Sequence, residues 1–368
     1  MTLFKKAALT VTAVLFAAVV FACAEYDNNG SGTAFPDKNP EDTSASEITT
    51  PAAEPITAKI NHTSVFLKDD GTFKFYRIKP ENFIDTVLSF SAETLYKAMK
   101  EEQAHLNRIL AANNKVNTYV YVCTRMQDTA YFNELVPDEL STYDMLQEFM
   151  SGIVGADGVD QFDIGTVEKR LEKIFKTDHH WNVFGSYEGY TDVIAMMNDV
   201  YPDIGEPIPM KGTIDFPAIA FRGSAARRGE YAAFTDVFQV IDIDLPVQHK
   251  TERVVSNLEK YKNGSYDNKP YATHYENFYN RPSVITYPEN KTGRRLLIIG
   301  DSYSYWASWL IGAHFDKTHV YYCLNGNTMD YNKFIEDNAI TDVLIMQFSS
   351  RLFQGSSIKG FLDQIKTR

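Results

Sequence analysis

The chain has 368 residues and a formal net charge of −12, with 48 acidic side chains against 36 basic ones. This balance argues against nucleic-acid binding, because neutralising phosphates requires clustered Lys and Arg side chains. Once the N-terminal segments are set aside, roughly 310 residues remain, a length at which α/β chains often form one domain. The sequence therefore predicts a single large domain that binds no nucleic acid.

Residues 1–24 have the features of a secretory signal. Lys5 and Lys6 precede a long apolar stretch that ends in small side chains, the order expected of a signal peptide. Residues 20–23 (Val-Phe-Ala-Cys) are similar to a bacterial lipoprotein box, in which Cys23 carries the lipid. Two alternatives stay open, an ordinary signal peptide of a secreted protein and an uncleaved membrane anchor. All three place the rest of the chain outside the cytoplasm, in association with the membrane or cell envelope, or secreted.

Residues 25–57 differ in composition from the rest of the chain. They are rich in Pro, Ser, Thr and acidic side chains and contain a single Lys. Such a segment cannot bury enough apolar surface to offset the entropy lost on ordering. We expect a disordered, acidic tether that separates a folded domain, residues 58–368, from the membrane.

The first half of this domain combines strands with helices. Alternating apolar residues around an Asp-Asp-Gly turn predict a β-hairpin over residues 64–78. Helical spacing of apolar residues predicts a helix over residues 92–112, followed by a strand over residues 116–123. Shorter amphipathic patterns predict helices over residues 166–175 and 187–200. A helix that leads into a strand is typical of a sheet covered by helices.

The C-terminal third has the clearest pattern. Four apolar residues, 296–299, are typical of a strand buried on both faces. Helices predicted over residues 303–312 and 331–337 alternate with strands over residues 320–324 and 343–348. This alternation implies an α/β fold with a mainly parallel sheet and right-handed crossovers. Sites in such folds form at the carboxyl edge of the sheet.

Gly300-Asp301-Ser302 lies at that edge, directly after the buried strand. A serine there can act as a nucleophile, and free backbone N–H groups at the start of the next helix can stabilise an oxyanion. The alternative is that Asp301 or Ser302 only caps the helix, since both residue types favour that position. The tripeptide alone does not separate the two interpretations.

An acid and a base for Ser302 stand in Asp178-His179-His180-Trp181. A serine hydroxyl needs an imidazole to take its proton and a carboxylate to orient that imidazole. In an extended segment Asp178 and His180 point to the same side, so His180 can face Asp178 and Ser302 with its two nitrogens. His179 is expected to point the other way and to serve the fold. Trp181 either packs in the core or contacts a sugar ring.

Metal and disulfide chemistry are the remaining alternatives. Adjacent histidines rarely converge on one metal ion, and no further ligand spacing completes a site here. We expect neither a metal nor a cofactor. Besides Cys23, the chain contains Cys123 and Cys323, each at the end of a predicted strand. These two can form one disulfide, although two buried free thiols are the interpretation that we favour.

Residues 177–182 (Thr-Asp-His-His-Trp-Asn) resemble the motif of the bacterial DHHW family. They are also similar to the Asp-x-His-Trp-Thr segment of alginate O-acetyltransferase-type SGNH-like proteins, from which Asn182 departs. In those families the Asp-x-His pair precedes the Gly-Asp-Ser nucleophile, as it does here. Weaker similarities are the loop at residues 221–224 and Arg351 after the last predicted strand. The resemblance covers nearly all of residues 58–368.

The resemblance implies an SGNH-hydrolase-like, three-layer catalytic domain over residues 58–368. It implies O-acetylation of an extracellular polysaccharide, in which a membrane-bound acyltransferase supplies the acetyl group and a serine carries it to a sugar hydroxyl. A carbohydrate acetylesterase and a catalytically silent cell-wall carbohydrate-binding protein stay open as alternatives. The implied site comprises a catalytic triad and a substrate-binding group: Ser302, His180 and Asp178, and Trp181, Ser224 and Arg351.

Overall fold

The structure is a computed structural model. The residues it describes are 62–231, 233–244, 259–264, 283–287, 290–323, 328–354 and 361–367. All of them belong to one compact unit, Asn61–Arg368. The predicted signal, the tether and Cys23 lie outside these described residues. Among the described helices, none combines the length and the apolar character needed to cross a bilayer.

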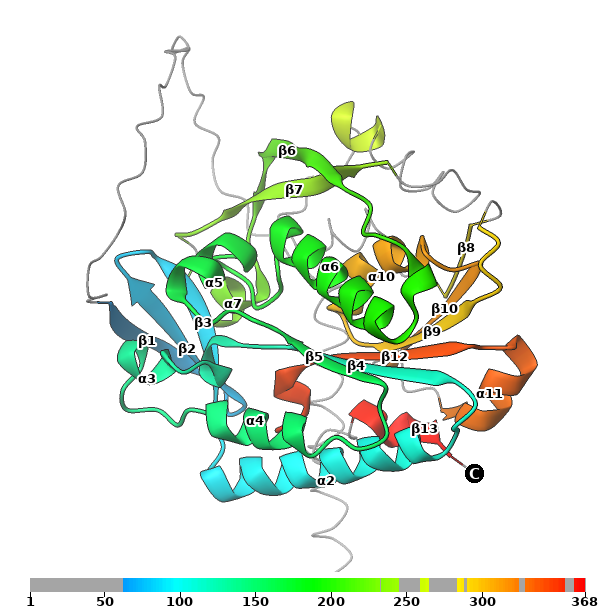
Figure 1. Ribbon diagram of the computed structural model, residues 1–368. Coiled ribbons are helices and arrows are strands. Elements are labelled where there is room, and N and C mark those ends of the chain that lie inside the picture. The colour runs from blue at the N-terminus through cyan, green and yellow to red at the C-terminus, as the bar shows by residue number, and fades with distance from the viewer. Residues whose placement is uncertain are drawn as a thin grey trace, which may run out of the picture. The chain divides into compact units, whose positions relative to one another are not determined.

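A six-stranded sheet forms the centre of the domain, in the order β5-β4-β12-β9-β10-β8. Its strands are parallel, except that β8 runs antiparallel to β10 at one edge (Figure 1). The prediction of an α/β fold with a mainly parallel sheet is therefore confirmed. In sheet order, the strands are β5 (Gly158–Phe162), β4 (Asn117–Cys123), β12 (Asp342–Phe348), β9 (Arg295–Gly300), β10 (Lys317–Tyr322) and β8 (Val284–Thr286).

Each face of the sheet carries its own hydrophobic core, because successive side chains of a strand point to opposite faces. Leu296 and Ile298 of β9 belong to one core, and Leu297 and Ile299 to the other. Figure 1 shows helices on both sides of the sheet. The first core contains α6 (Val183–Val200) and α10 (Ser304–Gly312), and the second contains α2 (Ala92–Ala111), α4 (Tyr143–Ser151) and α11 (Tyr331–Asn338).

The cysteines follow this division. Cys123, at the end of β4, belongs to the first core, and Cys323, after β10, belongs to the second. Both are buried and free. Burial raises the pKa of each thiol well above its ordinary value, so both stay protonated. The disulfide alternative is wrong, because the sheet separates the two side chains.

Smaller sheets surround the central one. The predicted hairpin is present as β1 and β2, and a third antiparallel strand, β3, extends it. An antiparallel pair, β6 and β7, lies beyond α6 in Figure 1. The remaining described elements are β1 (Thr63–Asp69), β2 (Phe73–Lys79), β3 (Phe83–Leu88), α3 (Phe132–Leu135), α5 (Val167–Lys173), β6 (Met210–Phe221), α7 (Ser224–Arg228), β7 (Asp236–Ile243), β11 (Met329–Asp330) and β13 (Ile365–Lys366), with 3₁₀ turns at Met126–Asp128, Pro202–Ile204, Ser349–Arg351 and Phe361–Gln364.

Hydrogen bonds join the loops that follow β4 and β12 at the carboxyl edge of the sheet. Arg125 and Asp128 form a buried ion pair with 2.7 Å between Nη2 and Oδ1. Asp128 also accepts hydrogen bonds from the hydroxyls of Thr142 and Ser349. A buried carboxylate with this many donors holds its partners in fixed positions. The loop after β12 is thereby fixed where it passes the turn that follows β9.

Candidate active site

The Asp-His-His motif lies in a tight loop between α5 and α6. Ile174 and Trp181 pair in an antiparallel bridge at the base of the loop. The N–H of Phe175 donates to the carbonyl of His180 at 3.2 Å, which closes the loop further. Asn182 then caps α6, since its Oδ1 accepts two backbone N–H groups of the first turn. A loop held at both ends presents its side chains in fixed directions.

The three side chains of the predicted triad meet at the carboxyl edge of the sheet. Nδ1 of His180 lies 2.6 Å from Oδ1 of Asp178, and Nε2 of His180 lies 2.7 Å from Oγ of Ser302. The Asp178 side chain is 1% exposed, whereas that of His180 is 19% exposed. The imidazole is thus anchored on a buried carboxylate and within proton-transfer distance of a serine that solvent can approach.

Asp178 is held as a carboxylate although it is buried. Burial opposes its charge, but the neighbouring imidazoles of His179 and His180 and the hydrogen bond from the Ser224 N–H keep its pKa well below the ordinary value. Oδ1 also accepts the N–H of His180 at 2.9 Å. A carboxylate only accepts hydrogen bonds, so Nδ1 of His180 carries the hydrogen and Nε2 is free to take a proton.

Asp301, and not Ser302, organises the turn after β9. Oδ1 of Asp301 accepts the N–H of Tyr303 at 3.0 Å, and Oδ2 accepts the N–H of Phe348 at 2.8 Å. The carboxylate therefore ties the turn to the end of β12. Burial raises the pKa of Asp301, with Arg351 and these two hydrogen bonds acting against it. Ser302 caps no helix, and its hydroxyl instead contacts His180.

Most backbone amides at the start of α10 are used by the turn itself. The N–H of Tyr303 donates to the Asp301 side chain, and that of Ser304 donates to the Asp301 carbonyl at 3.1 Å. The N–H of Tyr305 donates to the Ser302 carbonyl at 3.3 Å. The expectation that these amides are free for an oxyanion is wrong. The N–H of Ser302 remains as a donor, since no acceptor among the described residues bonds to it.

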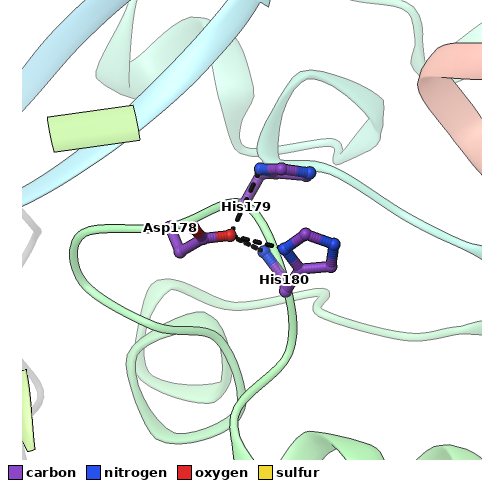
Figure 2. Close-up of side chains that lie close together, drawn as sticks. All are labelled: Asp178, His179 and His180. Atoms are coloured by element: carbon purple, nitrogen blue, oxygen red, sulfur yellow. Dashed lines mark hydrogen bonds and ion pairs between the residues drawn. The ribbon is translucent and has the colours of Figure 1, made fainter. Parts of the chain in front are cut away.

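His179 does not point away from the site, which corrects the prediction from the sequence. Its ring centre lies 4.0 Å from that of His180. Its Nδ1 lies 3.2 Å from Oδ1 of Asp178 and 2.8 Å from Oγ of Ser224. Figure 2 shows both imidazoles directed at one carboxylate. The prediction assumed an extended segment, but the backbone bends at every residue from 176 to 180.

The same three side chains form a possible metal-binding group. The ligand atoms of Asp178, His179 and His180 lie within 4.8 Å of one another. A hydrogen bond already joins Oδ1 of Asp178 to Nδ1 of His180, Nδ1 of His179 lies 3.2 Å from the same oxygen, and Oδ2 accepts the N–H of Ser224. An ion bound at Oδ1 would have to displace these contacts. The expectation of no metal stays a prediction.

Trp181 packs in the core and does not line the site. Its side chain has no exposed surface and contacts Phe162 and Tyr303 edge-on, with ring centres 5.5 and 5.2 Å away. Gly189 of α6 makes room for the indole, since a Cβ there would lie 2.4 Å from the ring. Gly185 lets α6 pass the loop, since a Cβ there would lie 2.2 Å from the Lys173 carbonyl oxygen and 2.8 Å from Cβ of Trp181. A buried ring cannot stack on a sugar, so the prediction of Trp181 as a substrate contact is wrong.

Ser224 and Arg351, the other two predicted substrate-binding residues, are placed at the site. Ser224 contacts the motif loop through both its N–H and its hydroxyl. Arg351 ends the 3₁₀ turn after β12, and its charge helps to lower the pKa of His179 and opposes the rise in that of Asp301. Their contact with substrate stays a prediction.

Gly223 lets the loop after β6 reach the motif loop. Its N–H donates to Oγ1 of Thr177 at 2.9 Å, and the next N–H, that of Ser224, donates to Asp178. A Cβ at position 223 would lie 2.4 Å from Cβ of Asp178 and 2.4 Å from the Thr177 carbonyl oxygen. Sequence reasoning singled out this loop only by resemblance. The lack of space for a side chain at position 223 follows from the packing of this loop against the motif loop.

We expect Gly223→Ala to lower the free energy of unfolding by about 1–3 kcal/mol, because the clash is with backbone and cannot be relieved by a rotamer change. Displacement of the Ser224 N–H from Asp178 should also reduce turnover of an acetyl ester by at least about tenfold. Urea unfolding and ester kinetics measure the two effects. Gly312→Ala is the control, since its Cβ meets its nearest neighbours at 3.4 Å. Equal stability of the two variants would contradict the packing argument.

Comparisons with known proteins show which solved structures share the fold. No family model and no curated protein matches the chain in sequence. A DHHW family protein from Eubacterium siraeum matches in structure with a TM-score of 0.57 and 15% identity, over 83% of this chain and 100% of that chain. PatB1 of Bacillus cereus matches with a TM-score of 0.55 and 15% identity, over 81% and 99%. PatB1 with a sulfonyl adduct matches with a TM-score of 0.56 and 13% identity, over 77% and 97%.

The structural matches establish the fold, whereas identities of 13–15% do not establish the activity. The resemblance drawn from the motif is confirmed at the level of fold. The resemblance was expected to cover nearly all of residues 58–368, and the structural matches agree, since they cover 83% and 81% of this chain and nearly the whole of the other two chains. The chain shares its fold with the DHHW family protein of Eubacterium siraeum and with PatB1 of Bacillus cereus.

Proposed function

We propose that the protein is a serine-dependent O-acetyltransferase that acts outside the cytoplasm on a hydroxyl of a polysaccharide. The observation that carries this proposal is the chain of contacts from buried Asp178 through His180 to Ser302, at 2.6 and 2.7 Å. An imidazole so placed can act as a general base toward the serine and as a general acid toward the leaving group. That the transferred group is acetyl and that the acceptor is a polysaccharide are inferences from the resemblance of the motif to the O-acetyltransferase families.

The first half of the proposed reaction acylates Ser302. Nε2 of His180 takes the hydroxyl proton while Oγ attacks the acetyl carbonyl carbon of the donor. The bond from that carbon to the donor oxygen breaks, and the donor oxygen receives the proton from His180. The N–H of Ser302 is a candidate donor to the oxyanion of the intermediate, because it has no acceptor in the described part of the chain.

The second half regenerates the serine. A hydroxyl of the acceptor gives its proton to Nε2 of His180 and attacks the carbonyl carbon of acetyl-Ser302. The bond from that carbon to Oγ breaks, and Oγ takes the proton back. Water can replace the acceptor in this step, in which case the protein is an acetylesterase. The partition between the two depends on how well the site binds the acceptor.

The setting of the site in the cell envelope is part of the proposal. Residues 1–24 direct export, Cys23 carries a lipid, and residues 25–57 tether the catalytic domain, which starts near residue 58. A membrane-bound acyltransferase supplies the acetyl group. The three-layer SGNH-hydrolase-like form of the fold is supported by helices on both sides of the parallel sheet (Figure 1).

Covalent labelling tests the proposal directly. Incubation of the full-length protein with 4-nitrophenyl acetate should add one acetyl group to the peptide that contains Ser302, as measured by mass spectrometry. A sulfonyl fluoride should block this label, because sulfonyl groups react with activated serines; PatB1, which shares the fold, has been solved with a sulfonyl adduct. Addition of an oligosaccharide then separates transfer from hydrolysis. A folded protein that takes no label would favour the carbohydrate-binding alternative.

A further inference from the structure

His179 is the member of the motif that the proposed triad leaves unused. Its Nδ1 lies 3.2 Å from Oδ1 of Asp178 and 2.8 Å from Oγ of Ser224. A lone pair on Nδ1 of His179 would face the negatively charged oxygen of Asp178, so we assign the hydrogen to Nδ1 on electrostatic grounds. The hydroxyl of Ser224 then accepts from this hydrogen. Nε2 of His179 is left with a lone pair.

The charge state of His179 agrees with this assignment. Burial lowers its pKa, and the neighbouring His180 lowers it further, to about 3, against the opposing effect of Asp178. The ring is therefore neutral at physiological pH. A neutral imidazole with its hydrogen on Nδ1 can only accept a hydrogen bond at Nε2.

The position of this lone pair is beside the reaction centre. Figure 2 shows both imidazoles extending from Asp178 to the same side, with their Nε2 atoms directed away from it. Nε2 of His180 meets Ser302 on that side, and the ring centres of the two histidines are 4.0 Å apart. The His179 side chain is 27% exposed, and its Nε2 has no hydrogen-bond partner within the described residues. Two hydrogen-bond acceptors thus lie next to each other, and one faces the nucleophile.

We propose that His179 is an acceptor-binding residue, whose Nε2 accepts a hydrogen bond from a second hydroxyl next to the one that attacks acetyl-Ser302. The inference rests on the proposed function and gives its acceptor class, a polyol with adjacent hydroxyls such as a sugar ring. His180 alone takes the proton of the attacking hydroxyl, and His179 takes none. Water and simple alcohols lack the second hydroxyl, so this contact favours transfer over hydrolysis.

The acceptor preference can be measured with small alcohols. Full-length protein turns over 4-nitrophenyl acetate in the presence of cis-1,2-cyclohexanediol or of cyclohexanol at the same concentration. The products are acetylated alcohol and free acetate, corrected for the background of Ser302→Ala. Both arise from one acetyl-serine, so their ratio does not depend on how fast that intermediate forms. The diol should give a transfer-to-hydrolysis ratio about three- to tenfold higher, the effect expected for one added hydrogen bond.

Two variants separate acceptor binding from a structural role. His179→Asn keeps a donor near the position of Nδ1 but has no group at Nε2, so the diol preference should fall to about one. His179→Gln can place an amide oxygen near the position of Nε2 and should restore part of the preference. A structural role alone would affect total turnover in both variants without changing this ratio.

The possible failures are distinguishable. If wild-type protein forms acetyl-Ser302 but transfers equally to diol and mono-alcohol, the inference about His179 is overturned and the proposed function stands. The same holds if His179→Asn keeps the wild-type preference. If no acetyl-Ser302 forms in the wild type, the proposed function fails and the inference fails with it.

Discussion

Replacing Ser302 with alanine is expected to abolish acetyl labelling and to reduce kcat/KM for an acetyl ester by at least about 10⁴-fold, the scale of losing a triad nucleophile. The reason is that the Ser302 hydroxyl is the group that His180 contacts at 2.7 Å. Its loss should change the free energy of unfolding by only about 1 kcal/mol, because this hydroxyl caps no helix. Intact mass, ester kinetics and urea unfolding measure the three effects.

Ser308→Ala provides the matched control for this variant. Ser308 is a buried serine of α10, the helix that follows Ser302, and its hydroxyl donates to the Tyr305 carbonyl at 3.2 Å. Its hydroxyl bonds within α10, so its replacement should leave labelling intact. Persistent acetylation of the Ser302→Ala variant, or a label at another residue, would show that the nucleophile has been misassigned.

Asp178→Asn is expected to reduce kcat/KM by about 10³–10⁴-fold with the protein still folded, since an amide in place of the carboxylate no longer selects the base tautomer. Asp178 accepts hydrogen bonds from Nδ1 of His180 and from two backbone N–H groups, those of His180 and Ser224. An asparagine has one acceptor oxygen and must turn its amide N–H₂ toward one of these donors. The His180 hydrogen then moves to Nε2, where it can no longer accept the Ser302 proton.

The stability of this variant has a defined pH dependence. Because the pKa of Asp178 is lowered by folding, its ionised form stabilises the native state above the unfolded pKa, and the effect is lost as pH falls through the folded pKa. Asp178→Asn should therefore be less stable than wild type at neutral pH, with a smaller difference in acid. Urea unfolding at several pH values measures this difference.

Asp236→Asn separates loop anchoring from catalysis. Asp236 accepts the N–H groups of Lys176 and Thr177 at 3.0 and 2.8 Å, so it holds the same loop without touching His180. This control should lose stability yet keep most of its turnover. If both aspartate variants lose activity to the same degree, the effect of Asp178 is on loop structure and its role in the triad is refuted.

Sequence reasoning predicted the parts of the fold that local pattern determines. The apolar run at residues 296–299 is typical of a strand covered on both faces, because successive side chains of such a strand are all buried. The position of Ser302 at the carboxyl edge then followed from the direction of that strand. The β6–β7 pair was missed, since most of its side chains are exposed or only partly buried and the pairing is interrupted by register shifts.

The site was predicted in part for a related reason. The meeting of Asp178, His180 and Ser302 follows from residue chemistry and a motif. The orientation of His179 and the burial of Trp181 depend on a loop that bends and on a helix that packs against it. Contacts between segments that are distant in the chain contribute to both, such as Gly223 against Thr177 in the motif loop and Tyr303 against Trp181. Periodicity within one segment contains no information about such contacts.

The fit between Trp181 and α6 has a consequence for how distant relatives are detected. A Cβ at residue 189 would lie 2.4 Å from the indole, and a Cβ at residue 185 would lie 2.2 Å from the Lys173 carbonyl oxygen and 2.8 Å from Cβ of Trp181. The tryptophan, the loop backbone before it and the two glycines are therefore one steric unit. The informative signature is therefore the longer pattern Asp-His-His-Trp-x-x-x-Gly-x-x-x-Gly, from Asp178 to Gly189. A chain with the four-letter motif but bulky residues at both later positions would need another way to seat the loop. Searches with the extended pattern should separate chance matches from chains that build this geometry.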